Sequence, residues 1–213
     1  MKEAILPLKD RLAKTPNSRT IKAAETKAAI LRSARKAFAT LGYDRAGLRG
    51  IAAAAGVTAM MVNRYFGTKQ QLFAQVVAAS MADPVILAPE NLASPTIARD
   101  MAASLIGLTS TDTEPLDGFL ILIRSASSEE AARIAREQIA AIHQASAQHA
   151  IHNGNHTAER AAILLALVAG LQVMRQMIGL KALADADPAT LVMLLTPLFQ
   201  QILDPSCEPA ICA

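Results

Sequence analysis

Cationic side chains are concentrated in the first third of this chain of 213 residues. Residues 1–75 hold 14 Lys and Arg against 4 Asp and Glu, whereas residues 76–213 hold 7 against 14. The overall formal charge of +3 hides this division. An excess of Lys and Arg binds polyanions, so the first part of the chain predicts a nucleic-acid partner. The acidic remainder predicts a second unit with a different partner.

Sequence patterns of common enzymes are not found. The chain contains no Gly-x-Ser-x-Gly, no His-Glu-x-x-His and no Cys-x-x-Cys. Residues 42–47 have the glycine spacing of a phosphate-binding loop, but Leu48 and Arg49 follow where Lys and Ser or Thr are required. We therefore expect no enzymatic activity and no cofactor.

The four histidines form the only group with metal-binding spacing, at His143, His149, His152 and His156. His149 and His152 share a helix face, and imidazoles at this spacing can converge on zinc or nickel. Alternatively, they end a helix, where a cation favours the helix dipole, and continue into a polar loop. No Cys or carboxylate obviously completes a site, so we expect no bound metal.

Three features bear on the compartment. Met1–Lys14 mixes charged residues into its few apolar ones, so it is not a secretory signal. The longest apolar run, Ala161–Leu171, has eleven residues and is too short to span a bilayer. Cys207 and Cys212 suggest no disulfide framework. We expect a cytoplasmic protein without a membrane partner.

Composition and periodicity predict an all-α protein. The chain is 52% apolar and only 3% aromatic, and formers of β-strands are scarce. Helical spacing, caps and breakers predict helices at about residues 19–40, 48–54, 58–65, 68 onward, 95–109, 115–124, 127–151, 158–183 and 188–203. Capping motifs are expected at Thr68 with Gln71, at Ser127 with Glu130, and at Asp187 before Pro188. Three prolines between residues 83 and 95 mark a domain boundary.

Leu48–Tyr65 carries the strongest motif. Ala52 is small where two short helices would cross, and Gly56 tolerates positive φ at the turn between them. Ile51, Ala55, Val57 and Val62 are apolar where the pair must pack against the preceding helix. This is the spacing of a helix-turn-helix, whose second helix enters the major groove. The alternative is an Ala-rich hairpin in an ordinary bundle, which the basic surroundings disfavour.

The segment 24–75 resembles the tetracycline-repressor (TetR) family of bacterial transcriptional regulators. The matching residues are Ile30, Ala34, Phe38, Gly42-Tyr43, Ile51-Ala52, Ala55-Gly56-Val57, Tyr65-Phe66, Lys69 and Leu72-Phe73. The resemblance implies an N-terminal three-helix DNA-binding domain and a C-terminal helical domain that dimerises and holds a small-molecule pocket. We therefore expect a basic arm at 1–18, a helix-turn-helix domain at 19–82, a ligand-binding and dimerisation domain at 83–204, and a tail at 205–213.

The resemblance also implies roles for individual residues. Contacts to the DNA backbone are expected from Arg49, Thr58, Tyr65 and Lys69. Base reading is expected from Ala59, Met60, Asn63 and Arg64, with Arg64 meeting either a guanine or a phosphate. Two positions depart from the family. Asn63 stands where Tyr is common and could pair with adenine, and Gly47 replaces a Thr or Ser that would supply a hydroxyl to phosphate.

The apolar helices near the C-terminus are expected to form the interface of a two-fold homodimer, which would present two reading helices to a near-palindromic operator. The alternative is that they only fill their own core. Candidate linings of an effector pocket are Met101, Phe119, Arg124, His143, Gln172, Met174 and Met177, although Met at helical spacing is more often plain core.

The few polar groups near these residues favour an apolar or aromatic effector. The resulting prediction is a repressor that releases its operator when the effector binds. The alternative function is an architectural DNA-binding protein on the same fold without an effector. A core closed to ligands would favour that alternative.

Overall fold

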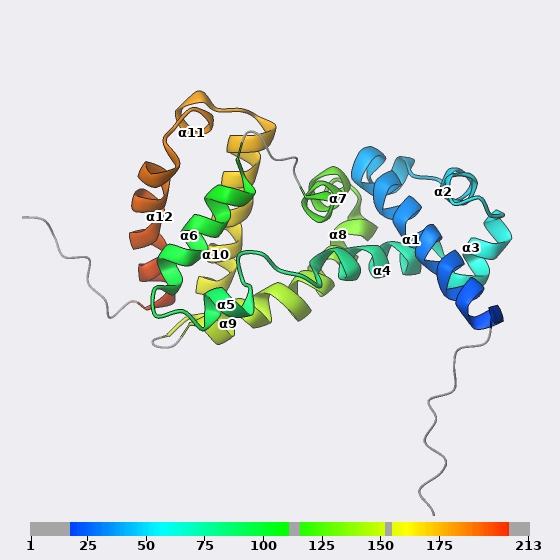
Figure 1. Cartoon of the computed structure of the whole chain (residues 1–213), viewed down its shortest axis with the longest axis horizontal. Helices are drawn as coiled ribbons and strands as arrows, with labels where there is room; N and C mark the ends of the chain where they lie inside the picture. Colours follow the sequence, from blue (N-terminus) through cyan, green and yellow to red (C-terminus); the bar gives the residue numbers. More distant parts are fainter. Residues whose placement is uncertain (1–17, 111–115, 152–154, 205–213) are drawn as a thin grey trace, which may run out of the picture.

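The computed structural model describes residues 18–110, 116–151 and 155–204, and within these ranges the chain is helical with no strand. The DNA-binding end contains α1 (Ser18–Arg45), α2 (Leu48–Ala54), α3 (Ala59–Phe66) and α4 (Lys69–Met81). Figure 1 shows α2 and α3 at one extremity of the molecule and α12 at the other. The predicted all-α fold class is confirmed.

The core of the DNA-binding end forms around aromatic side chains. Phe38 and Phe73 are fully buried and meet edge to face with ring centroids 5.0 Å apart. Tyr43 contacts Phe73 in the same manner at 4.9 Å. Ile51 and Val62 pack into the same cluster, as predicted for the inner faces of α2 and α3. The motif is therefore held by burial against α1 and α4.

Two helices that come later in the sequence also join this core. They are α7 (Asp117–Ser125) and α8 (Glu129–Ile139), which contribute Ile121, Ala131 and Ile134 to the cluster that contains Phe38. In Figure 1, α7 and α8 lie between the DNA-binding end and the remaining helices. The sequence boundary expected near residue 83 therefore does not coincide with a boundary between hydrophobic cores.

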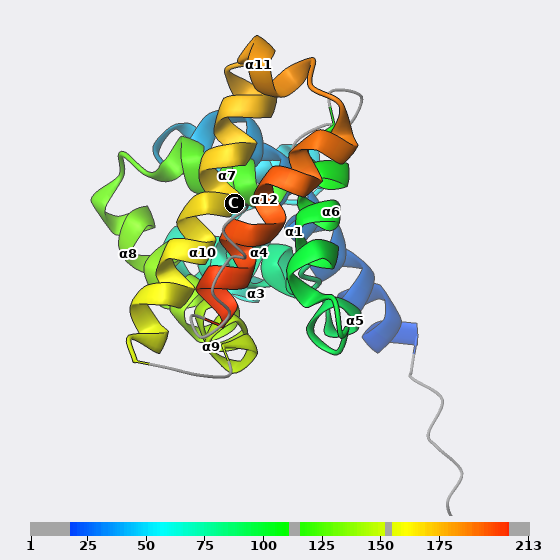
Figure 2. The same cartoon turned by 90° about the vertical axis from the view of Figure 1, so that its left-hand side faces the viewer.

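A second core is built from the remaining helices. The π-helical segments η1 (Ala140–Gln144) and η2 (Val173–Met177) follow α8 and α10, and Ile142 of η1 packs against the first core. The second core comprises α5 (Pro89–Leu92), α6 (Ile97–Leu108), α9 (Ala145–Ala150), α10 (Thr157–Gln172), α11 (Lys181–Ala184) and α12 (Pro188–Leu203). Met101, Leu105, Leu164 and Phe199 are fully buried at its centre. Figure 2 shows α10 and α12 side by side across this end of the molecule.

Two of the three expected capping motifs are confirmed. Thr68 and Gln71 form the reciprocal capping box of α4, and the Asp187 carboxylate accepts from the Thr190 amide ahead of Pro188. The box at Ser127 and Glu130 is wrong, because α8 starts one residue later, after Ser128. The Glu130 carboxylate does not cap α8; it accepts hydrogen bonds from Tyr43 on α1 and Gln70 on α4.

Two helix ends also differ from the expectation. The first helix continues past residue 40 to Arg45, with a kink at Gly42, where φ is +72°. The helix expected over 158–183 stops earlier, since Gly179 also has positive φ (+68°) and the short α11 follows as a separate turn. Both glycines interrupt the helix, but directly after Gly42 the helical path resumes as far as Arg45.

Gly42 is required by its surroundings as well as by its backbone. A Cβ at this position would overlap the carbonyl oxygen of Arg124 on α7. We expect Gly42→Ala to lower the free energy of unfolding by about 3 kcal/mol, because positive-φ strain and steric overlap add together. Urea denaturation followed by circular dichroism measures this. Gly107→Ala is the control, because a Cβ there meets nothing within 4 Å and the substitution should leave stability equal or slightly higher. Equal stability of both variants would contradict the close approach of α1 and α7.

Candidate nucleic-acid interface and effector cavity

The helix α3 is anchored on one side and open on the other. Val62 and Phe66 are buried against the core, whereas Met60 is 80% exposed. Asn63 and Arg64 are also exposed, and Ala59 is partly exposed. The outward face of α3 thus carries an amide, a guanidinium and an apolar thioether, which can read hydrogen-bonding groups and thymine methyl groups at base edges.

The turn that presents α3 has the expected geometry. Gly56 adopts φ +68°, and the Val57 amide donates to the Ala52 carbonyl at 3.0 Å. Ala52 is buried at the crossing of α2 and α3. These short-range bonds fix the angle between the two helices, so the outward face of α3 is held rigidly.

Side chains for backbone contacts surround α3. The Thr58 hydroxyl accepts from the Met61 amide at 3.3 Å, which leaves its own hydrogen free to donate outward. Arg49 on α2 is exposed, and in the described part of the chain neither Arg49 nor Arg64 forms an ion pair. Tyr65 is partly buried. Cations without intramolecular partners are suited to phosphate oxygens.

Lys69, which was predicted to contact a phosphate, also forms contacts within the protein. Its Nζ donates to the Asp44 carbonyl at 3.2 Å and lies 4.5 Å from the centre of the Tyr43 ring. The ammonium therefore ties the start of α4 to the end of α1. It retains further N–H donors, so a phosphate contact stays compatible with this position.

A polar cluster that the sequence did not reveal lies beside Lys69. Tyr43 donates its hydroxyl to Glu130 Oε2 and Gln70 donates its amide to Glu130 Oε1, both at 2.6 Å. Ser128 donates to Asp44 Oδ1 at 3.0 Å. We call Tyr43, Gln70 and Glu130 the hinge cluster, because it joins α1 and α4 of the DNA-binding end to α8. Glu130 gave no signal in sequence beyond a mistaken cap, since its partners lie 60 and 87 residues away.

The hinge cluster changes the acidity of its members in opposite directions. The hydrogen bonds from Tyr43 and then Gln70 lower the pKa of Glu130. Burial and the nearby Glu130 carboxylate raise the pKa of Tyr43. A carboxylate with a lowered folded-state pKa stabilises the folded chain above its unfolded pKa, and this contribution is lost as the pH falls through the folded value. The contact between α8 and the DNA-binding end should therefore weaken in acid.

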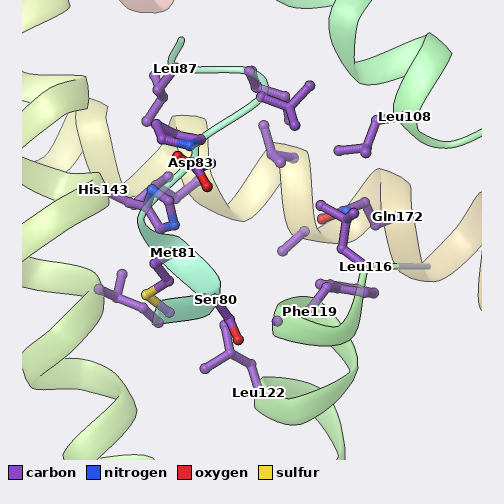
Figure 3. A pocket seen from close by; sticks show the side chains of 18 of the residues that line it. Ser80, Met81, Asp83, Leu87, Leu108, Leu116, Phe119, Leu122, His143 and Gln172 are labelled. Carbon is purple, nitrogen blue, oxygen red and sulfur yellow. The ribbon is translucent and has the colours of Figure 1, made fainter. Parts of the chain in front are cut away.

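A cavity of about 200 Å³ lies where the C-terminal end of α4 meets α6, α7, α8, η1 and α10 (Figure 3). Its lining includes Met101, Phe119, His143 and Gln172 from the predicted set. Sequence reasoning missed the contributions of Ser80, Met81, Asp83 and Leu87, which lie at and after the end of α4. Burial lowers the pKa of His143, so its imidazole is neutral at pH 7.

Three predicted pocket residues do not line this cavity. The Arg124 guanidinium turns toward α1 and donates to the carbonyls of Ala39 and Thr40. Met174 and Met177 are 40% and 39% exposed on the outer side of η2. Their side chains are therefore directed to the surface and not into the core.

Three of the four histidines lie in the described part of the chain. His143 lines the cavity, His149 lies on α9, and His156 precedes α10 with φ +64°. His152 lies outside the described residues. In the ranges that the structure describes, no three His, Cys, Asp or Glu side chains come together as a metal site.

One apolar helical stretch extends beyond the eleven-residue run in both directions. Thr157–Met177, which consists of α10 and η2, has the length and composition to cross a membrane. Only 17% of its most apolar window is buried within the chain. Met193 and Leu194 of the neighbouring α12 are also mostly exposed. Both helices therefore present apolar surface that the single chain leaves uncovered.

The fold and the outward-facing α3 define a helix-turn-helix DNA-binding protein. Family models match both halves of the chain: bacterial regulatory proteins of the tetR family at residues 30–76, and the tetracyclin repressor-like C-terminal domain at residues 96–203. The chain belongs to the TetR family of transcriptional regulators, as the resemblance in sequence predicted.

Solved structures share this fold. A TetR-family regulator from Streptomyces coelicolor A3 is 23% identical, with 89% of this chain and 98% of that one covered and a TM-score of 0.58. NalD of Pseudomonas aeruginosa, the secondary repressor of the MexAB-OprM multidrug efflux pump, is 24% identical, with 85% and 97% covered and a TM-score of 0.60. The fatty acid degradation regulator FadR of Bacillus halodurans is 18% identical, with 83% and 97% covered and a TM-score of 0.59. Comparison with curated proteins gave no significant match.

The hinge cluster makes a prediction about acidity. Tyr43→Phe removes the hydrogen bond that contributes most to the lowered pKa of Glu130, so the pKa of Glu130 should rise toward its ordinary value. Carboxyl-carbon NMR titration of the two proteins measures this change. Tyr65→Phe alters the other tyrosine of the chain and should leave the Glu130 titration unchanged. A Glu130 pKa that is identical in wild type and Tyr43→Phe would show that this hydrogen bond does not form in solution.

Proposed function

We propose that this regulator is a repressor that binds a near-palindromic operator as a homodimer and leaves it when a small apolar effector enters the cavity. One observation carries the DNA-binding part: Met60, Asn63 and Arg64 stand exposed on α3, opposite the buried anchors Val62 and Phe66. The basic front of the chain supplies attraction to phosphate that is independent of sequence. NalD, with the same fold, is described as a repressor, which supports this sign of regulation.

The DNA-reading residues divide into two roles in this proposal. Ala59, Met60, Asn63 and Arg64 contact base edges in the major groove, and Arg49, Thr58, Tyr65 and Lys69 contact the backbone. The division follows from position, because the first group lies on or beside the outward face of α3. Members of the second group lie on α2, at the two ends of α3 and at the start of α4.

The dimer part of the proposal is supported by apolar surface on η2, α10 and α12. The exposed side chains are Ile163, Met174, Met177, Ile178, Met193, Leu194 and Leu198. Large apolar side chains gathered on neighbouring helices mark an interface. A two-fold interface formed by α10 and α12 would cover these side chains. No membrane would then be needed to cover them, in agreement with a cytoplasmic protein. The same interface would also place two copies of α3 on one DNA duplex.

The release part rests on helices that connect the cavity to the hinge cluster. The helix α4 has Gln70 in the hinge cluster near its first residue and Ser80 in the cavity wall near its last. The helix α8 has Glu130 in the hinge cluster and ends at Ile139 in the cavity wall. A ligand that spreads the cavity would therefore shift both helices and with them the spacing of the two reading helices. The presence of a cavity favours this function over an effector-free architectural protein.

Two substitutions test the division of roles on DNA. Asn63→Ala should change the preferred sequence with a loss of about 1–3 kcal/mol at the base it reads, because a base contact carries sequence information. Lys69→Ala should weaken binding to all sequences alike and reduce the salt dependence. Selection of bound DNA from a random pool, followed by affinity measurements at two salt concentrations, distinguishes them.

Lys181→Ala is the control for loss of a positive charge. Lys181 lies on α11, outside the DNA-binding end, so its substitution should leave DNA affinity unchanged. A changed base preference with unchanged affinity in Lys69→Ala would contradict its phosphate role. Because Lys69 also bonds to Asp44, each variant is first checked by thermal unfolding.

The dimer interface is tested by Leu194→Glu, which places a charge on a side chain that is 57% exposed on α12. Two such charges facing each other across a two-fold axis should separate the subunits. Light scattering should then give the single-chain mass of 22.5 kDa in place of twice that value, and operator affinity should fall. Ile21→Glu changes an apolar residue on α1 that is 45% exposed and should leave the mass unchanged. A wild-type protein that is monomeric at micromolar concentration would refute the interface.

A further inference from the structure

The described lining of the cavity is almost without charge. Asp83, which is exposed, is the only Asp or Glu among the described residues that form it, and no Lys or Arg is among them. Three others are polar and uncharged: Ser80, His143 and Gln172. In the view of Figure 3, Asp83 and His143 lie toward one end of the cavity and Gln172 toward the other. The cavity therefore has apolar walls, with one carboxylate, that of Asp83, at its exposed edge.

Two cations that are close in sequence to cavity residues, Arg124 and Arg175, form their hydrogen bonds elsewhere. Arg124 donates to carbonyls of α1. Arg175, one turn beyond Gln172, is only 4% exposed and donates to the Ile106 carbonyl at 2.7 Å and to the Leu183 carbonyl at 3.0 Å. Neither guanidinium lines the cavity. A carboxylate or phosphate on a ligand would thus enter without a compensating cation, which is unfavourable in an apolar site.

The neutral polar groups are available for hydrogen bonds with a ligand. The Ser80 hydroxyl is buried and has no partner in the described part of the chain. Gln172 is 6% exposed, and its side chain borders the cavity. Buried polar groups normally have partners, so an unpaired hydroxyl in a cavity wall favours a ligand that can pair with it.

We propose that the effector is a small apolar molecule that carries a protonated amine, with the ammonium beside Asp83 and the apolar body between α4, α7 and α10. This inference rests on the proposed function, since it names the ligand of the same cavity. The volume of about 200 Å³ suits one aromatic ring with a short chain, because a cavity of about 150 Å³ accepts benzene. Anionic ligands are disfavoured for the same reason that amines are favoured.

Three probe molecules with one carbon skeleton separate charge from shape. They are 3-phenylpropylamine, 3-phenylpropan-1-ol and 3-phenylpropanoate, which carry a positive, a neutral and a negative group at pH 7. Isothermal titration calorimetry of the full chain should show the amine binding about tenfold more tightly than the carboxylate, with the alcohol between them. The factor combines attraction of one probe and repulsion of the other by a carboxylate at the cavity wall.

Variants assign the preference to this site. Asp83→Asn should remove most of the difference between amine and carboxylate, whereas the matched control Asp185→Asn, on the end of α11, should retain it. Ala169→Phe fills the cavity and should weaken all three probes. Circular dichroism confirms that each variant is folded.

Several results would overturn the proposal. These are equal or tighter binding of the carboxylate, a preference unchanged in Asp83→Asn, binding unaffected by Ala169→Phe, or binding of none of the probes by a folded protein. DNA binding is measured on the same preparations without probes. A protein that binds its selected DNA but does not prefer the amine contradicts the ligand class alone. A protein that binds no DNA contradicts the proposed function and leaves the amine preference measurable.

Discussion

The carboxylate of Glu130 on α8 joins α1 and α4, and the position of the DNA-binding end relative to α8 depends on this connection. One of its oxygens accepts from Tyr43 at the end of α1, and the other accepts from Gln70 in the first turn of α4. Charge-assisted bonds of this kind are stronger than bonds between neutral groups. Around them, Gly42 allows α7 to approach α1 closely, and Lys69 lies over the Tyr43 ring. These contacts also determine the orientation of α3, because α3 packs on the same core as α1 and α4.

The protein has two hydrophobic cores, and the division between them does not follow the proline-rich segment of the sequence. Ile121 and Ile134 come after the proline-rich segment in sequence, yet they complete the core of the DNA-binding end. The cavity lies where α4, α7 and α8 leave this core and meet α6 and α10 of the other. A ligand there contacts helices that belong to both cores. For this reason we propose the cavity as the site that controls the spacing of the two α3 helices in a dimer.

Local features of the sequence predicted much of the DNA-binding end. Gly56 at the turn, Ala52 at the crossing and Val62 as an anchor were all identified from spacing of a few residues, and the structure confirms their geometry. The candidate pocket was predicted less well. Met101 and Phe119 line the cavity, but Arg124 turns to α1 and Met177 faces outward. Helical periodicity shows which residues share a face and does not show what that face meets.

The sequence by itself determined the helical class, the helix-turn-helix and the basic front, because these depend on composition and on residues within one or two helical turns of each other. Tertiary structure decided the partners of Glu130, the second contact of Lys69 and the position of the Asp83 carboxylate at the edge of the cavity. Each of these depends on side chains brought together from distant segments, as Tyr43 and Glu130 are across 87 residues. Such pairings are set by how whole helices pack, since a buried polar group bonds to whichever partner the packing places within reach.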